Sequence, residues 1–192
     1  MKLSHAVITS VDRDDLPDLG AAHWAQTIRE IKRLNPETTT EVLIPDFQGR
    51  KELVDQVIKA CPEIISHNME TVKRISPQVR SAANYHTSLE VIRQIAESGI
   101  TAKSGIMVGL GETPAEVEEL MDDLISVGCK ILTIGQYLQP THKHFPVAAY
   151  ITPEQFAVYK ETGLKKGFEQ MESAPLVRSS YHAEKHIRFN NK

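Results

Sequence analysis

Polar residues follow two short apolar runs of this chain and could together bind a ligand. Asp14 and Asp15 come after residues 6–8, whereas Asn68 and Glu70 come after residues 64–65. A carboxylate accepts hydrogen bonds from a ribose hydroxyl or an ammonium group, and an amide side chain both donates and accepts. This mixture of groups suits a polar, nucleoside-like ligand.

A glycine-rich loop supplies a second candidate site. Residues 109–112, with the sequence GLGE, lead into the start of a helix at Thr113. Free backbone N–H groups and the helix dipole favour an anionic ligand group there. The loop is neither a Walker loop nor a full GxGxxG motif, and an ordinary turn before a helix cap is the simpler interpretation of the same residues.

Short apolar runs alternate along the chain with amphipathic helical patterns. The runs are too short for helices, and several are rich in β-branched residues, which favours strands. Capping boxes at Thr87 and Thr113 and a further cap at Thr152 mark helix starts. Strands are predicted at residues 6–8, 42–44, 64–65, 104–108 and 131–134, and helices within 24–34, 53–58, 87–99, 113–128 and 152–171, with a further short helix at 69–75.

This β/α repetition predicts parallel strands that wind in a right-handed sense. In β/α barrels the loops that follow the strands form the active-site face. We therefore expect the polar segments after the predicted strands to converge on one mouth. These segments are residues 9–15, 45–49, 67–70, 109–112 and 136–140.

Composition indicates a single soluble domain. The chain has 192 residues, of which 41% are hydrophobic, and a net charge of −3. This length supports a substantial core, and no apolar run approaches the ~20 residues of a membrane span. The start of the chain does not have the pattern of a signal peptide, and no basic stripe indicates nucleic-acid or membrane binding, so we expect a cytoplasmic protein. Cys61 and Cys129 are too far apart in sequence to be a metal pair, and we expect both to be buried thiols.

Several longer motifs, taken together, resemble one family. IPDFQG, HNMETV, KSGIMVGLGET, TIGQYLQPT and RSSYHA occur in that order, and they resemble the C-terminal part of lipoyl synthase, a radical S-adenosylmethionine (SAM) enzyme. The resemblance implies a partial, TIM-type β/α barrel. It also implies sulfur insertion into C6 and C8 of a protein-bound octanoyl group, with SAM and two 4Fe-4S clusters as cofactors.

The family resemblance also assigns roles to individual residues. Ser180 of the RSSY motif would be a ligand of the auxiliary cluster, with its neighbour Ser179 as the alternative. Asn68 and Glu70 would contact SAM. The segment from Ser10 through Asp14 and Asp15 would lie where related enzymes bind the SAM amino group. Gln136 would line the barrel mouth.

The CxxxxCxxxxxC and CxxxCxxC motifs that bind the family's clusters do not occur in this chain. We therefore expect a fragment that begins just before the second barrel strand, retains about five parallel strands and is inactive alone. We divide it into a partial barrel over residues 1–172 and a C-terminal segment over 173–192. The expected partners are an octanoylated lipoyl carrier protein or lipoyl domain and a reducing electron donor.

Two alternatives remain at this point. One is a noncatalytic remnant that binds SAM or a carrier protein. The other is an unrelated β/α-barrel enzyme that binds phosphate at residues 109–112 or forms a Schiff base through Lys103.

Overall fold

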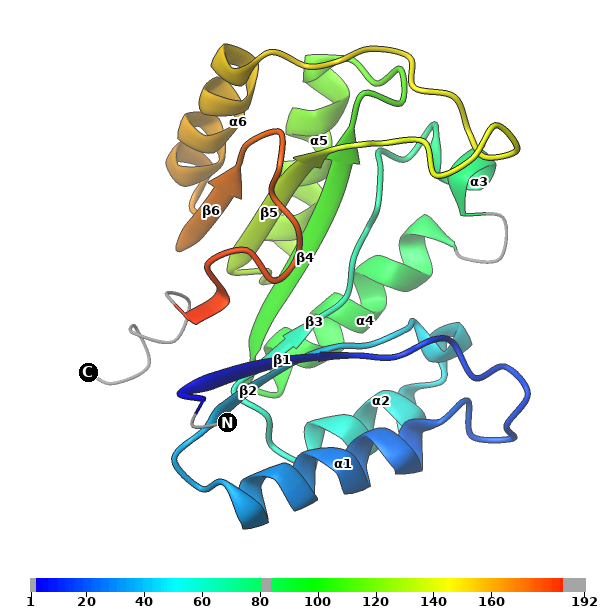
Figure 1. Ribbon diagram of the computed structural model, residues 1–192, viewed down its shortest axis with the longest axis vertical. Coiled ribbons are helices and arrows are strands. Elements are labelled where there is room, and N and C mark those ends of the chain that lie inside the picture. Colours follow the sequence, from blue (N-terminus) through cyan, green and yellow to red (C-terminus); the bar gives the residue numbers. More distant parts are fainter. Residues whose placement is uncertain (1–2, 81–83, 185–192) are drawn as a thin grey trace.

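The fold is an open, curved sheet of parallel strands with helices on its outer side, as the computed structural model shows for residues 3–80 and 84–184 (Figure 1). Each strand pairs with its predecessor along the chain, so the six strands lie in sequence order. The strands are β1 (His5–Thr9), β2 (Thr39–Leu43), β3 (Ile64–Ser66), β4 (Thr101–Val108), β5 (Ile131–Gln136) and β6 (Gln170–Ser173). This arrangement confirms the predicted partial β/α barrel.

Helices connect successive strands and cover the outer face of the sheet. Their bounds are α1 (Ala21–Leu34), α2 (Lys51–Ile58), α3 (Ser76–Val79), α4 (Tyr85–Glu97), α5 (Pro114–Ser126) and α6 (Pro153–Lys166), with the 3-10 turn η1 (Phe47–Gly49) after β2. The capping box predicted at Thr113 is present, because its hydroxyl accepts from the Glu116 N–H while the Glu116 carboxylate accepts from the Thr113 N–H. Thr152 caps α6 as predicted. None of the described helices has the length and apolar character needed to cross a membrane.

The sheet has one strand more than the sequence analysis predicted. Met171 was assigned to the last helix, but it lies in β6 and pairs with Leu132 of β5. The helix ends earlier because Gly167 adopts a left-handed conformation, with φ of 116°, directly after Lys166. Glycine is the residue that most readily takes this C-terminal conformation.

Two local predictions were also wrong. Asn84, and not Thr87, caps α4, because its side-chain oxygen accepts from the backbone N–H groups of His86 and Thr87. The short helix expected at residues 69–75 is instead α3, which begins at Ser76. Residues 69–72 remain close to the sheet, where Glu70 forms a bridge with Ile106.

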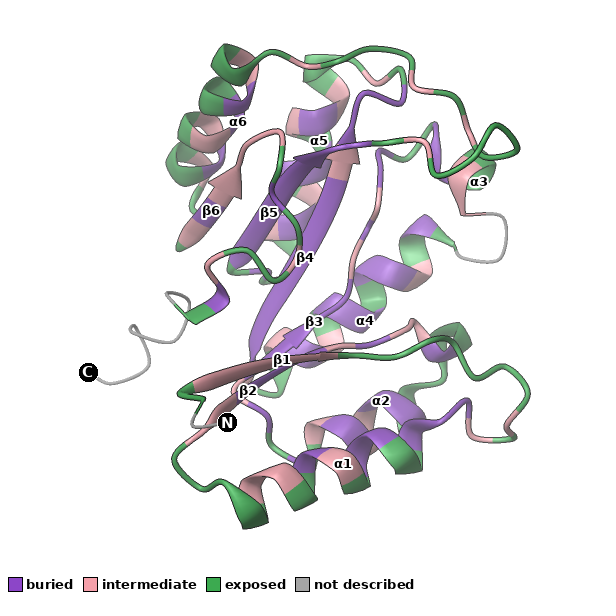
Figure 2. Ribbon diagram, in the orientation of Figure 1, coloured by how far each residue is buried: buried purple, intermediate pink, exposed green. Residues whose placement is uncertain are grey.

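The apolar core lies between the sheet and its helices, and Figure 2 shows that β3 and β5 are buried along their length and β4 along all but its end. Each of the five longer helices contributes buried side chains to it. Cys129 is buried as expected, whereas Cys61 is exposed, so the prediction for Cys61 was wrong. The core includes Ile28, Val54, Ile92, Leu120 and Phe156 from the helices and Val42, Ile65, Ile106, Val108, Leu132 and Ile134 from the strands.

Candidate functional site

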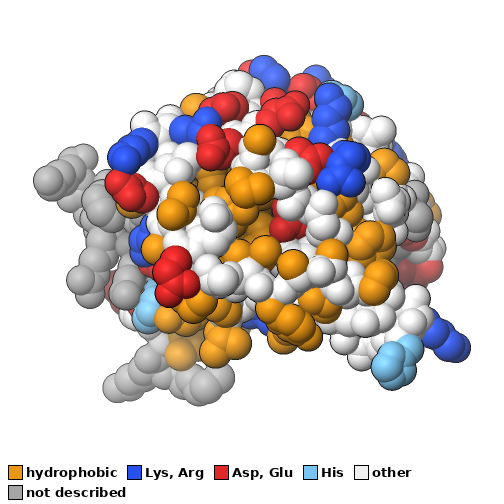
Figure 3. Space-filling model, turned by 90° about the horizontal axis from the view of Figure 1, so that it is seen from above, with side chains coloured by type: hydrophobic (Ala, Val, Ile, Leu, Met, Phe, Trp, Pro, Cys, Tyr) orange, Lys and Arg blue, Asp and Glu red, His pale blue; other side chains and the backbone are white. Residues whose placement is uncertain are grey.

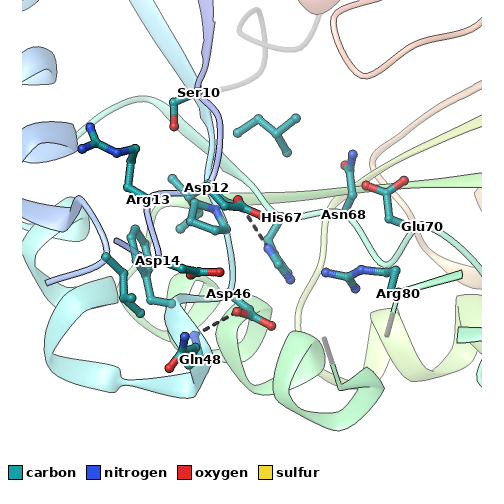
Figure 4. A pocket seen from close by; sticks show the side chains of 15 residues that line it. Ser10, Asp12, Arg13, Asp14, Asp46, Gln48, His67, Asn68, Glu70 and Arg80 are labelled. Carbon is teal, nitrogen blue, oxygen red and sulfur yellow. Dashed lines mark hydrogen bonds between the residues drawn. The ribbon is translucent and has the colours of Figure 1, made fainter. Parts of the chain in front are cut away.

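A polar cavity of about 360 Å³ opens at the carboxyl ends of β1, β2 and β3. Figure 4 shows that its labelled side chains come from the segments that follow these strands and from the end of α3. Four residues predicted for SAM line it: Ser10, Asp14, Asn68 and Glu70. The polar lining is completed by Asp12, Arg13, Asp46, Gln48, His67 and Arg80.

His67 fixes the start of the segment that follows β3. Its Nδ1 lies 3.0 Å from the carbonyl oxygen of Ile44, which can only accept, so Nδ1 carries the proton. Its Nε2, 2.9 Å from the hydroxyl of Ser88, then acts as the acceptor. Burial lowers the pKa of His67 to about 4, so the ring is neutral at pH 7. The neutral imidazole thus ties the segment to β2 and α4.

Asn68 and Glu70 present polar groups from this fixed segment. The Oδ1 atom of Asn68 is buried without a hydrogen-bond partner within the described part of the chain. A buried unpaired acceptor is costly and marks a position where a ligand donor would fit. Burial raises the pKa of the Glu70 carboxyl, and hydrogen bonding to Asn68 and the charge of Arg80 partly offset this effect.

The backbone holds Glu70 in an unusual conformation. Its φ is 63°, in the left-handed region that residues with a side chain seldom adopt. The Glu70 N–H donates to the carbonyl of Gly105, and the N–H of Met107 donates to the carbonyl of Glu70. These two bonds to β4 maintain the conformation and point the carboxylate into the cavity. Backbone strain of this kind clusters at ligand sites.

Arg80 is a cavity residue that the sequence analysis missed. It stands at the end of α3, and its Nη1 donates to the Ser88 hydroxyl at 3.0 Å. Figure 4 shows its guanidinium directed toward His67, below Asn68 and Glu70 in this view. No sequence pattern marked it, because it is ten positions beyond Glu70 along the chain. Asp46 lies in the segment 45–49, which was expected at the mouth, although no ligand-binding role was assigned to it.

Two residues predicted for the site do not line the cavity. Asp15 is exposed and forms a bidentate ion pair with Arg13, whose Nε and Nη2 donate to its carboxylate oxygens at 2.8 and 2.7 Å. Gln136 is buried, and its amide donates to the carbonyl oxygens of Tyr137 and Ala149 and accepts from the Ile151 N–H. Gln136 therefore holds the long connection between β5 and α6 in place.

The GLGET loop has an internal anion. The carboxylate of Glu112 accepts hydrogen bonds from the backbone N–H groups of Gly109 and Leu110, at 2.6 and 2.9 Å. Because the Thr113 N–H is also used, in the capping box of α5, the backbone N–H groups that could bind a phosphate already donate to carboxylates of the chain itself. The cap interpretation is thus correct, and the phosphate-binding alternative has no support here.

The RSSY segment approaches the predicted SAM residues through a second cavity of about 120 Å³. Asn68 and Glu70 line one part of it, and Arg178 and Ser179 line another. Ser180 follows directly and is exposed. The cavities therefore bring the HNMET and RSSY motifs together, although they are more than a hundred residues apart in sequence.

The described residues offer more binding groups for SAM than for an iron–sulfur cluster. The first cavity offers carboxylates, an amide and a guanidinium, which suit the amino, carboxylate and ribose groups of SAM. Iron–sulfur clusters need several thiolates. The described residues contain no group of three or more His, Cys, Asp or Glu side chains placed to hold a metal ion. Ser180 could therefore supply one ligand to a cluster, and the remaining ligands would have to come from other residues.

Comparison with known proteins identifies the family. The sequence profile of the Radical SAM superfamily matches residues 1–124. Lipoyl synthase from Bacteroides fragilis is 99% identical over 192 residues, which are 100% of this chain and 67% of that protein. Lipoyl synthase from Phocaeicola vulgatus is 80% identical over 98% of this chain and 66% of its own length. The mitochondrial lipoyl synthase of Nematostella vectensis is 57% identical over 97% of this chain and 65% of its length.

Solved structures show the same fold at low sequence identity. A domain of pyruvate-formate lyase-activating enzyme from Bacteroides vulgatus covers 86% of this chain and 98% of its own, with a TM-score of 0.64 and 15% identity. Streptococcus suis SuiB bound to S-adenosylmethionine covers 97% of this chain and 53% of its own, with a TM-score of 0.55 and 10% identity. This chain spans about two thirds of the length of the curated relatives it matches, and it belongs to the lipoyl synthase family of radical SAM enzymes, which are sulfurtransferases of lipoate biosynthesis that use SAM and 4Fe-4S clusters.

Proposed function

We propose that this chain forms the SAM-binding and auxiliary-ligand part of a lipoyl synthase that inserts sulfur at C6 and C8 of an octanoyl group. The octanoyl group would be carried on a lysine of a lipoyl carrier protein or lipoyl domain. The observation that carries the proposal is the pair of cavities that share Asn68 and Glu70. One cavity also contains Ser10 and Asp14, and the other contains Ser179.

In this proposal, residues 1–172 position SAM and residues 173–192 contribute the auxiliary ligand. Bound SAM and the clusters would supply a 5′-deoxyadenosyl radical and the sulfur atoms. Asn68 would accept a hydrogen bond through its unpaired Oδ1, and Glu70 would accept from a ribose hydroxyl or an ammonium group. Ser180 would offer its hydroxyl oxygen to the auxiliary cluster. Holding these groups in fixed relative positions favours reaction between oriented partners.

The surface at the carboxyl ends of β4 and β5 suits an acyl substrate. Figure 3 shows hydrophobic side chains over the middle of the face seen from above, with charged side chains of both signs mainly toward one margin. Leu138 and Tyr150, in the connection between β5 and α6, are 49% and 75% exposed. Exposed apolar residues of this kind favour contact with an alkyl chain or a partner protein. We place the enzyme in the cytoplasm, because its reducing conditions keep cysteines as free thiols and suit a reducing electron donor.

The experiment measures SAM binding to the full-length enzyme by titration calorimetry. Asn68→Ala and Glu70→Ala should each weaken binding about tenfold or more, since each removes a hydrogen-bonding group from a partly desolvated site. Glu30→Ala is the matched control, because that exposed carboxylate on α1 is paired with Arg33 and neither residue lines the cavity. Its affinity should match that of the wild type.

Thermal unfolding of each variant separates binding from folding, because residues in strand-end loops carry function while the sheet carries stability. Unchanged affinity in both Asn68→Ala and Glu70→Ala would remove these residues from the SAM site. A loss in Glu30→Ala equal to theirs would show that the cavity does not define the binding site.

A further inference from the structure

A buried ion pair lies on the inner face of the sheet, opposite the helix layer. Lys103 of β4 and Glu41 of β2 are fully buried, and Nζ lies 2.7 Å from Oε1. Glu41 is in register with Ile64, and Ser66 is in register with Lys103, so both side chains project to the same side across β3. An ion pair withdrawn from water is maintained only where additional hydrogen bonds compensate its desolvation.

Lys103 makes such an additional bond to the C-terminal segment. Its Nζ donates to the carbonyl oxygen of Ser179 at 2.5 Å. One ammonium group thus joins β4, β2 and the RSSY motif. This contact engages the amine that the Schiff-base alternative would require.

The hydrogen bond from Lys103 to Ser179 also constrains Ser180, the next residue. The carbonyl of Ser179 and the N–H of Ser180 belong to one planar peptide unit. Once Lys103 fixes that plane, only φ and χ1 of Ser180 separate the plane from the Ser180 hydroxyl oxygen. A hydrogen bond to the preceding carbonyl therefore restricts where the oxygen can lie.

The rest of the segment is anchored by close packing. A side chain at Gly135 of β5 would collide with the carbonyl oxygen of Val177, so glycine there lets the segment approach the sheet. Val177 and Ala183 are buried, whereas Ser180 between them is exposed. Pro175 accepts from the Gln136 N–H at the end of β5, and Ser179 meets Lys103 near the start of β4. The segment after β6 therefore folds back along the inner face, as Figure 1 shows.

We propose that Lys103, held by Glu41, is a positioning residue that orients the Ser179–Ser180 peptide and thereby places the Ser180 oxygen for ligation. This inference rests on the proposed role of Ser180 as a ligand. Lys103 itself touches neither SAM nor the cluster in this scheme. It acts through the peptide plane that it holds.

The test uses full-length protein and a double variant, Lys103→Met with Glu41→Leu. Replacing both members of a buried pair with apolar residues of similar size preserves packing without leaving a charge unpaired. Lys103→Met alone is included to show the cost of leaving Glu41 unpaired. Lys32→Met is the matched control, because it breaks a partly buried bond between α1 and Glu63, the residue before β3, on the helix-covered side of the sheet.

Hydrogen exchange of the cluster-free protein tests the anchor without any activity. The amides of Tyr181 and Ala183 donate within the local turns of the segment, to Arg178 and Ser180. Their exchange should accelerate about tenfold or more in the double variant, as expected for loss of a charge-assisted hydrogen bond. Exchange in the control should match the wild type. Unchanged exchange in the double variant would overturn the proposal.

Spectroscopy of the cluster-loaded enzyme tests the consequence for Ser180. The Mössbauer spectrum of the double variant should show the same altered iron site as Ser180→Ala, while 5′-deoxyadenosine formation continues. If Ser180→Ala changes the spectrum and the double variant does not, Lys103 is not the positioning residue. If Ser180→Ala leaves the spectrum unchanged while exchange is accelerated in the double variant, the anchor stands and the ligand role of Ser180 is wrong.

Discussion

Acid should destabilise the native protein through His67. The imidazole is buried, with its nitrogens engaged by the Ile44 carbonyl and the Ser88 hydroxyl, and its pKa falls from 6.5 to about 4. The unfolded chain therefore takes up a proton at His67 at a higher pH than the folded chain does. Protonation consequently favours unfolding as the pH decreases.

The size of the effect follows from the two pKa values. The stabilisation from neutral His67 is complete above pH 6.5, decreases as the pH falls, and is lost once the pH passes below about 4. One pKa unit corresponds to about 1.4 kcal/mol, so the full effect is about 3 kcal/mol. About 2 kcal/mol of this should be lost between about pH 7 and about pH 4.5.

The assay is urea unfolding of full-length protein at these two pH values, comparing the wild type with His67→Asn. Asparagine can still donate to the Ile44 carbonyl but does not titrate in this range. The variant should be less stable at neutral pH, because the Ser88 contact is lost. On acidification, however, its free energy of unfolding should decrease by about 2 kcal/mol less than that of the wild type. His142→Asn, at an exposed position, should behave like the wild type. Equal acid sensitivity of the wild type and His67→Asn would refute the reasoning.

Two further predictions concern the clusters. In full-length enzyme, Ser180→Ala should retain 5′-deoxyadenosine formation but lose most lipoyl product on an octanoylated peptide, whereas Ser179→Ala should retain product. Equal lipoyl yields from Ser180→Ala and the wild type would contradict the ligand assignment. The 192-residue chain alone, treated anaerobically with iron and sulfide, should hold no redox-active 4Fe-4S cluster, because Cys129 is buried and Cys61 is exposed at a separate position. Stoichiometric iron with a reducible cluster spectrum would show this expectation to be incorrect.

Local signals in the sequence were sufficient for much of the fold. Thr113 and Thr152 have capping partners a few residues away, so the starts of α5 and α6 could be predicted. The strand β6 was missed because it has only four residues and because Met171 also fits the spacing of the preceding helix. The left-handed glycine at 167 was the available signal, since it ends the helix before the strand begins.

The sequence predicted which polar residues lie at the strand ends, but not the direction of each side chain. Strand-end position correctly brought Ser10, Asp14, Asn68 and Glu70 to one cavity. Neighbouring residues nevertheless face different ways: Asp14 lines the cavity, while Asp15 turns to Arg13 in solvent. Such choices depend on local ion pairs and on backbone direction, which residue type alone does not encode.

The contacts of Lys103 show a stronger limit of sequence reasoning. A lysine within the run TAKSGIMV must be paired if the strand is buried, but its partners lie 62 residues earlier, at Glu41, and 76 residues later, at Ser179. Neither pairing has a periodic or local signature. The same strand also holds Glu70, which we propose to contact SAM, because the carbonyl of Gly105, two positions after Lys103, accepts from the Glu70 N–H. Strand β4 therefore contacts both the RSSY segment and the segment that we propose to bind SAM, and small displacements of this strand should alter the two segments together.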